Sequence, residues 1–448
     1  MRARPAEVDE EGLVDWVSSR VIRSELNCFK SRAFSTWWIG FQVGTYNDAQ
    51  AAARPPSGPE AIKPSMRAYL AAALLLALLA PLSAKLVTIR NDVPRLDTNG
   101  DIIDCHSGNI VFHAGLYVIV GEMYKNYSGL HCGKANETAC LFPKIVTYSS
   151  PDLQAWTFRG EALGGMYPNA PFGTHFTPWI LPPNERNSNW TLWHNAYPNG
   201  CCTGEFWTST SKDGALFELV STNQSGALKI ADCNGLFVDE DLTAYNIYSS
   251  EAADHHVSIE VLSSNYSTFA GENLGSFPVR YVEGPILFRR GGWLYASFGS
   301  CNCFARAGTG MLVYRARSVM GPWVRQPYDL NCNSTDENAV CGAYGDRQTG
   351  GLTIAAQGIS FSYIPLANGS TVILWQGERW QTAPFNNPDC PDECQKPIGP
   401  CAPDPRYVKG HGLSYWIPLR FDPDGNVLPL EPFVNSFELD IAVAGDAA

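Results

Sequence analysis

The sequence Glu283-Gly284-Pro285-Ile286-Leu287-Phe288, followed after a turn by Trp293-Leu294-Tyr295-Ala296-Ser297-Phe298, carries the pattern that determines the fold. A polar or acidic residue precedes a short apolar strand, and a longer strand rich in aromatic residues follows the turn. The same layout occurs five times, roughly 50 to 75 residues apart, which is typical of the four-stranded blades of a β-propeller. The five leading strands span residues 109–112, 178–181, 235–238, 285–288 and 359–362.

The partner strands support the same division of the chain. They are enriched in β-branched and aromatic residues and bounded by Gly, Asn and Asp, which favours strands over helices. They span residues 116–120, 190–193, 244–248, 293–298 and 372–375, and residues 415–421 close the fifth repeat. After Ala84 no run shows helical periodicity. We therefore predict an all-β, five-bladed β-propeller with a central channel; the alternative is a β-sandwich, which also has short strands and regular turns.

In a propeller the inner strand of every blade begins at one mouth of the channel. Residues that precede these strands therefore converge in space although they lie far apart in the sequence. Here they are His106, Asp232, Glu283 and Gln357. The pattern predicts a polar site at the mouth, with two carboxyl groups.

Composition limits the kinds of partner. Of the 448 residues, 45% are hydrophobic and 17% charged, and the formal net charge is -12. No basic cluster occurs in the body of the chain, so nucleic acid is excluded as an expected partner. Aromatic residues make up 12% of the chain, which suits a carbohydrate-binding groove, although most of the 13 Trp are expected to pack between blades.

Three signals indicate the secretory pathway. Residues 68–84 form an apolar run that follows Met66-Arg67 and ends in small residues, as a signal peptide does. Asn-X-Ser/Thr glycosylation motifs occur only after this run. Of the 14 cysteines, 13 also follow it. The seven motifs begin at Asn126, Asn136, Asn189, Asn223, Asn265, Asn333 and Asn368.

The same run has a second interpretation, because 65 residues precede Met66. Either Met66 is the true start and cleavage follows Ala84, or residues 66–84 stay as the single anchor of a type II membrane protein, although ~20 apolar residues are usual for a span. The expected organisation is a poorly structured extension (1–65), a signal peptide or anchor (66–84) and the propeller (85–440). A membrane is an expected partner only if residues 66–84 are retained.

The cysteines favour disulfides over a zinc site. Cys301-Asn302-Cys303, Cys201-Cys202 and the group Cys390, Cys394 and Cys401 lack the paired Cys-x-x-Cys spacing of structural zinc. The odd number after Ala84 leaves one thiol unpaired or linked to another chain, and the sequence alone does not determine the pairing.

An ordered series of motifs runs from residue 97 to about residue 425, with one set for each blade. The motifs are Asp97-Thr98-Asn99-Gly100-Asp101-Ile102, His106-Ser107-Gly108, Leu236-Phe237-Val238-Asp239-Glu240-Asp241, Glu283-Gly284-Pro285, Gly321-Pro322-Trp323, Gln376-Gly377-Glu378-Arg379-Trp380, Arg406-Tyr407 and Trp416-Ile417-Pro418-Leu419. Any single motif is weak evidence, whereas the ordered series is strong. The series resembles glycoside hydrolase family 43, in its exo-β-1,3-galactanase-like branch.

The resemblance implies glycosidic cleavage, with Glu283 as general acid and Asp232 as the carboxylate that tunes and orients it. Glu283 follows apolar Val282 and precedes Gly284-Pro285, which restrains the backbone. Cleavage with inversion needs a base on the opposite face of the sugar, about 6.5 to 9.5 Å from the acid. Opposed blades can supply that separation.

The base is the unusual part of the site. Most family members have an Asp before the first inner strand, where this chain has His106. The galactanase-like branch is thought to use a Gln of the last blade in its imidic acid form, and Gln357 matches that position. Asp104 is the alternative base.

The resemblance also implies sugar contacts and leaves two functions open. Candidate substrate-binding residues are His106, Glu122, Arg379, Trp380 and Asp104, and the substrate is a polysaccharide or glycoprotein glycan. Some relatives hold a cation near a His, which here could be His411, but we assign no metal and expect no cofactor. The two functions are an exo-acting glycosidase on β-1,3-galactan or arabinogalactan chains, and a catalytically inactive glycan-binding propeller.

Departures from the family pattern weaken the substrate inference. The second blade has His175-Phe176-Thr177-Pro178-Trp179 where Arg-Pro-Lys is common, and residues 381–410 form an insertion beside the last blade. An invertase-like fructosidase on the same fold would need a Trp-Met-Asn-Asp-Pro-Asn signature, which this sequence lacks.

Overall fold

The computed structural model of the protein describes residues 82–124, 144–164, 174–197, 204–300, 308–332, 351–380 and 412–444. These residues all belong to one compact unit, Leu70–Ala448, whereas the unit Met1–Tyr69 lies outside the described residues. Within the described ranges the chain forms strands and one 3-10 helix, η1 (Glu251–Ala253). None of the described helices is long and apolar enough to cross a membrane.

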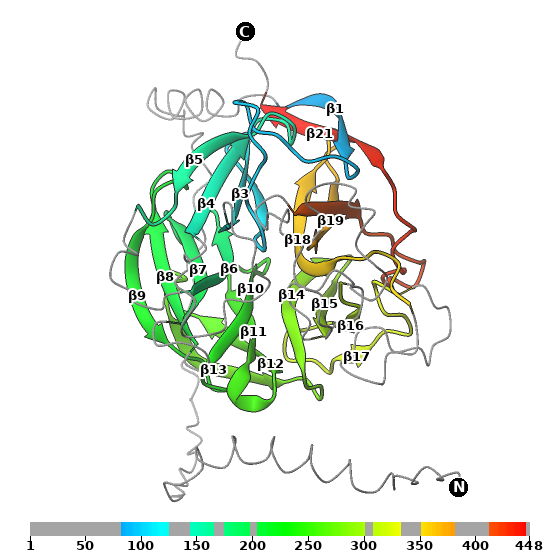
Figure 1. Ribbon diagram of the computed structural model, residues 1–448. Coiled ribbons are helices and arrows are strands. Elements are labelled where there is room, and N and C mark those ends of the chain that lie inside the picture. Colours follow the sequence, from blue (N-terminus) through cyan, green and yellow to red (C-terminus); the bar gives the residue numbers. More distant parts are fainter. Residues whose placement is uncertain are drawn as a thin grey trace, which may run out of the picture. The chain divides into compact units, whose positions relative to one another are not determined.

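Five antiparallel sheets surround a central axis, and Figure 1 looks along that axis. The five-bladed propeller is confirmed, and the β-sandwich is wrong. Blade 1 is β2 (Ile110–His113), β3 (Leu116–Met123), β4 (Lys144–Ser150) and β5 (Thr157–Glu161); blade 2 is β6 (Thr174–Leu181), β7 (Trp190–Tyr197), β8 (Glu205–Ser211) and β9 (Glu218–Gln224). Blade 3 is β10 (Ala231–Val238), β11 (Ala244–Ser250), β12 (His256–Leu262) and β13 (Phe269–Ser276). Blade 4 is β14 (Val282–Arg290), β15 (Trp293–Ser300), β16 (Met311–Ala316) and β17 (Val324–Arg325), and blade 5 is β18 (Gln357–Pro365), β19 (Thr371–Arg379) and β20 (Leu413–Pro418).

A sixth sheet, which the repeat pattern does not predict, joins the two ends of the described body. It pairs β1 (Leu82–Arg90) with β21 (Ser436–Ala444) in antiparallel register. A bridge from Leu366 to Ile441 attaches it to blade 5. The last three residues of the expected leader, 82–84, lie in β1.

The inner strands β6, β10, β14 and β18 contact one another in sequence around the axis. Blade 1 closes the ring, because β18 contacts β2 and β6 contacts β3. Their backbones approach closely: a Cβ on Gly235 would lie 2.4 Å from the carbonyl oxygen of Pro285. The closure between blades 5 and 1 is polar. Ser360 Oγ donates to the Gly108 carbonyl at 2.8 Å, and the Ile110 N–H donates to Ser362 Oγ at 2.9 Å.

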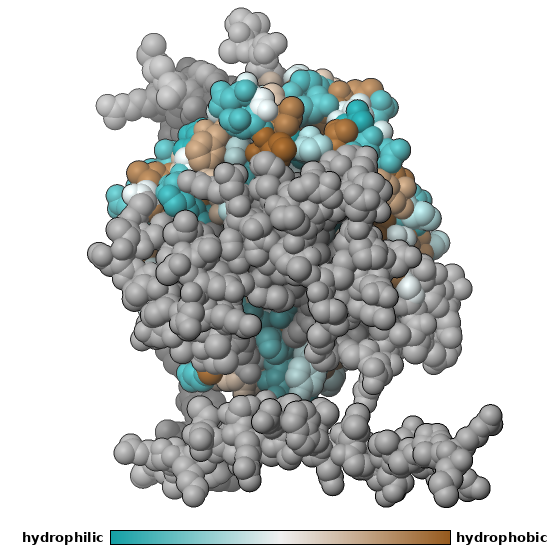
Figure 2. Space-filling view, in the orientation of Figure 1, coloured by the Kyte–Doolittle hydropathy of each residue, from teal (hydrophilic) through white to brown (hydrophobic). Residues whose placement is uncertain are grey.

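Aromatic side chains fill the space between blades, as the composition predicts. Buried Trp193, Phe206 and Tyr248 belong to one core cluster with Tyr295 and Trp375, which draws on blades 2 to 5. Large rings suit this role because each removes a large apolar area from water. In the orientation of Figure 2, hydrophilic and hydrophobic residues are intermixed on the described surface near the top, over β1 and β21.

Candidate functional site

Antiparallel pairing within each blade places the start of the inner strand beside the end of the second strand. Glu283 lies opposite Gly299, and Gln357 lies opposite Glu378. The ladder is irregular just after these positions, between Glu283 and Ile286 and between Gly358 and Ser360. Such bulges re-aim side chains and are frequent beside active sites. The predicted convergence of these residues at one end of the inner strands therefore has a local structural basis.

Asp232, Glu283 and His255 form the acidic part of the site. His255 Nδ1 donates to Asp232 Oδ2 at 3.0 Å and lies 3.9 Å from Glu283 Oε1. One side-chain ligand atom from each residue lies within 4.8 Å of the other two. Both carboxyl side chains are buried, with 7% of each residue exposed. Within the described residues, this is the one group of His, Cys, Asp or Glu side chains with spacing that would suit a metal ion.

Hydrogen bonds keep Asp232 ionised. Burial alone would raise the pKa of this carboxyl, but the bond from His255 and its positive charge, together with the bond from Ser249, outweigh burial and lower the pKa. Ser249 Oγ donates to Oδ2 at 2.8 Å, and the Tyr197 hydroxyl donates to Oδ1 at 3.3 Å. Asp232 is therefore a fixed negative charge next to Glu283.

The sequence reasoning missed His255. It follows η1, where Asp254 and His255 adopt left-handed φ angles of 52° and 51°. Two successive residues in this region turn the chain sharply, and the His255 ring comes to lie against Asp232. The only sequence signal is Asp254-His255-His256, polar residues in the connection between two apolar strands.

Gln357 lies at the mouth end of blade 5, next to blade 4. Its Oε1 accepts a 2.7 Å hydrogen bond from the indole N–H of Trp380, and both side chains are buried. The two blades approach closely here, because a Cβ on Gly284 would lie 3.0 Å from the carbonyl oxygen of Gly358. Glu283 and Gln357 are therefore on adjacent inner strands, as the repeat predicts.

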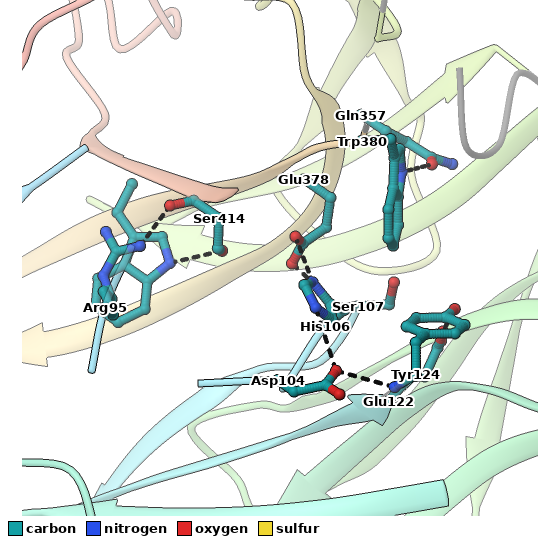
Figure 3. Close-up of polar contacts among 11 residues, drawn as sticks. Arg95, Asp104, His106, Ser107, Glu122, Tyr124, Gln357, Glu378, Trp380 and Ser414 are labelled. Carbon is teal, nitrogen blue, oxygen red and sulfur yellow. Dashed lines mark hydrogen bonds and ion pairs between the residues drawn. The ribbon is translucent and has the colours of Figure 1, made fainter. Parts of the chain in front are cut away.

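His106 is held between two carboxylates (Figure 3). Its Nδ1 lies 3.0 Å from Glu378 Oε2, and its Nε2 lies 3.4 Å from Asp104 Oδ1. The residue is only 1% exposed. Burial alone would lower the pKa of His106, but Glu378 and Asp104 outweigh it and raise the pKa to about 10. At neutral pH this group is a buried imidazolium.

Three further candidates are held by protein groups. Glu122 accepts a hydrogen bond from the Tyr124 hydroxyl and a 2.7 Å bond from the Thr177 N–H. Asp104 accepts a 2.9 Å bond from the Tyr124 N–H. The Arg379 guanidinium lies 4.7 Å from the centre of the Phe433 ring, a cation–π distance.

Glu378 is the residue of this group that the sequence reasoning did not single out. Its neighbours in the motif, Arg379 and Trp380, were chosen instead. Glu378 could have been found from its place in the hairpin, because it pairs with Gln357 across the two strands, and side chains on β19 alternate between its two faces.

The altered motif of blade 2 places its side chains in different environments. His175 is fully buried, with its ring centroid 5.0 Å from that of His194 and 5.3 Å from that of Trp207. Burial lowers the pKa of His175 to about 3, so the ring is neutral. Thr177 instead contacts Glu122, with a left-handed φ of 46°. The candidate His411 and the insertion 381–410 lie outside the described residues.

No protein-family model matches the sequence, and no curated protein is significantly similar to it. Solved structures do match. An exo-β-1,3-galactanase from Clostridium thermocellum superposes with a TM-score of 0.59 at 18% identity, covering 80% of this chain and 68% of that one. The fold is that of glycoside hydrolase family 43.

Two further structures agree. A family 43 β-1,3-galactosidase with galactodeoxynojirimycin has a TM-score of 0.55 at 18% identity, covering 77% of this chain and all of that one. An exo-β-1,3-galactanase from Phanerochaete chrysosporium with galactose has a TM-score of 0.56 at 17% identity, covering 79% of this chain and 69% of that one. The expected fold resemblance is thus confirmed.

Proposed function

We propose that the protein is a glycoside hydrolase that releases terminal galactose from β-1,3-linked galactan, with Glu283 as general acid. The observation that carries this is the cluster of Asp232 and Glu283, at the start of the adjacent inner strands β10 and β14, with His255 from the connection before β12. An ionised Asp232 within 4.8 Å disfavours a second negative charge on buried Glu283, and the proposed role needs Glu283 to carry a proton for the leaving oxygen. The fold neighbours include the Phanerochaete chrysosporium enzyme with β-1,3-galactotriose, which supports the substrate class.

Asp232 is too close to Glu283 to be the base of an inverting reaction. That reaction needs a water between two groups about 6.5 to 9.5 Å apart, whereas these carboxyl oxygens lie within 4.8 Å. Asp232 therefore tunes and orients the acid, and the base comes from elsewhere. Gln357, on the adjacent inner strand, is the proposed base.

In the proposed step, a water oxygen attacks the anomeric carbon as the bond to the leaving oxygen breaks, and the proton of Glu283 goes to the leaving oxygen. The proton of the water goes to the imidic nitrogen of Gln357. Gln357 then loses its O–H proton to solvent and returns to the amide, while Glu283 takes a proton back from solvent.

The test is galactose release from β-1,3-galactan by the purified protein. Glu283→Gln should reduce the rate at least about 100-fold, the usual contribution of general acid catalysis, while galactan binding measured by calorimetry persists. Glu272→Gln, an exposed change of the same chemistry on β13, is the matched control. NMR should show α-galactose as the first product of an inverting cleavage. Galactan binding without hydrolysis by the unaltered protein would show instead that the propeller only binds glycans.

We also propose that the propeller is lumenal or extracellular. Cys332 is disulfide-bonded, as expected of a chain that folds in an oxidising compartment. Asn265 and Asn368 are exposed and therefore accessible as glycosylation sites. Peptide-N-glycosidase should lower the apparent mass of the native protein, and sequencing its N-terminus distinguishes cleavage from an anchor. An unchanged mass would contradict the proposal.

A further inference from the structure

Trp380 lies between His106, which is held by Asp104 and Glu378, and Gln357 (Figure 3). The residue follows β19 and is 1% exposed. Its ring centroid lies 5.5 Å from that of His106 and 6.0 Å from that of Tyr124, which meets it edge-on. Its N–H donates to Gln357 Oε1 at 2.7 Å. The rings of His106 and Tyr124 thus confine the indole, and its N–H points at Gln357 Oε1.

This hydrogen bond determines which way the amide of Gln357 faces. An indole nitrogen can only donate, whereas a carboxamide has an accepting oxygen at one end and two N–H donors at the other. If the amide turned over, two donor groups would face each other in a buried place. Trp380 therefore keeps Oε1 on its own side and turns Nε2 away from the indole.

The orientation matters because only one end of Gln357 can take a proton from water. In the imidic acid form the nitrogen carries an accessible lone pair, and the oxygen carries a hydrogen. The bond from Trp380 places Oε1 at the indole, so the nitrogen is at the opposite end of the amide, where the proposed step needs it. An overturned amide would present its oxygen, which cannot play the proposed role.

The environment of His106 holds Trp380 in place. The imidazolium lies within cation–π range of the indole, and Glu378 and Asp104 fix it from both sides. A positive charge on the ring surface also makes an indole N–H a stronger donor. Tyr124 is a further titratable group beside His106, with its ring centroid 5.7 Å from that of His106, and its hydroxyl donates to Glu122. Arg95 and Cys105 interact electrostatically with Glu378 in the same cluster.

We propose that Trp380 is a positioning residue of the glycosidase reaction, whose indole N–H selects the orientation of the Gln357 amide. This inference rests on the proposed function, in which Gln357 takes the proton of the attacking water. It assigns Trp380 an effect on the rate of cleavage, in place of the sugar contact that the family resemblance implies.

The test is the variant Trp380→Phe in the full-length protein, because Phe keeps an aromatic ring and removes only the donor and the second ring. With β-1,3-galactotriose as substrate we expect kcat to fall roughly 10- to 100-fold, as for one lost hydrogen bond to a buried polar group. KM should stay within about twofold, because the contact acts on the reacting geometry and not on substrate binding. Trp193→Phe is the matched control: Trp193 is fully buried and its N–H donates to the Tyr266 carbonyl, in the core of blades 2 and 3.

A second background separates positioning from a merely structural effect. In Gln357→Glu the two carboxylate oxygens are equivalent, so the base no longer depends on one orientation. There Trp380→Phe should change kcat less than about threefold, because no amide remains to be oriented. An equal loss of kcat in the unaltered and the Gln357→Glu backgrounds would mean that Trp380 only supports the fold. If Trp380→Phe leaves kcat unchanged in the otherwise unaltered protein, the inference is also overturned, while the proposed function stays intact. If the unaltered protein releases no galactose, the proposed function fails, and this inference fails with it.

Discussion

Replacing His106 by Gln should destabilise the protein strongly, in a way that depends on pH. The change removes the positive charge between Glu378 and Asp104 and leaves two buried carboxylates without their cation. Breaking a buried ion pair by removing one partner costs about 3 to 5 kcal/mol. The pKa of His106 rises from 6.5 to about 10 on folding, which is equivalent to about 5 kcal/mol when each unit is about 1.4 kcal/mol. We therefore expect His106→Gln to lower the free energy of unfolding by about 3 to 5 kcal/mol.

The sign of the pH dependence follows from that raised pKa. A folded state that binds the proton more tightly gains its full stabilisation below the unfolded pKa of about 6.5. The gain is lost as the pH rises through about 10, where the folded group also releases its proton. The difference in unfolding free energy between the unaltered protein and His106→Gln should therefore be largest at pH 6 and shrink steadily towards pH 10.

The measurement is urea unfolding followed by tryptophan fluorescence at pH 6, 8 and 10. His256→Gln is the control, because burial and Arg280 lower the pKa of His256 and it carries no comparable proton in this range. His256→Gln should lower the free energy of unfolding by less than about 1 kcal/mol, and by the same amount at each pH. The buried imidazolium does not stabilise the fold if His106→Gln unfolds at the same urea concentration as the unaltered protein at pH 6, or if the deficit in unfolding free energy is constant up to pH 10.

Three other changes test the site and its framework. Gly284→Ala should lower galactose release and stability together, because Gly284 has a φ of 58° and its new Cβ would lie 3.0 Å from the Gly358 carbonyl; parallel kinetics and thermal melts check this. Asn109→Ala should lower the free energy of unfolding in urea by roughly 1 to 3 kcal/mol. The side-chain amide of Asn109 donates to the Ile180 carbonyl and accepts from the Ile180 N–H in the next blade, and both hydrogen bonds would be lost. Asp232→Asn should lose stability at pH 7. The deficit should shrink as the pH falls below the unfolded value of about 3.9, because the lowered pKa of Asp232 gives its full stabilisation only above that value and the stabilisation is lost as the folded group takes up its proton. Equal deficits at pH 7 and pH 3 would contradict it.

The inner strands were predictable because they are buried on both sides. β14, for example, carries Ile286, Leu287 and Phe288 in the core, and this apolar run is bounded by polar residues. The outermost strands were not found. β13 (Phe269–Ser276) is mostly exposed, so burial leaves no alternation in its sequence. The pairing of β1 with β21 was not predicted either, because the two strands lie at opposite ends of the described chain and repeat no blade motif.

The sequence by itself determined the five blades and the positions of Glu283, Asp232 and Gln357 at the mouth. It could do so because each of these residues precedes an apolar strand, and that relation is local. Only the tertiary structure decided what each of them contacts. His106 reaches Glu378 across 272 residues, and His255 turns back onto Asp232 through two left-handed residues. Contacts of this kind depend on how the ring closes and how a loop turns, and no run of neighbouring residues encodes either.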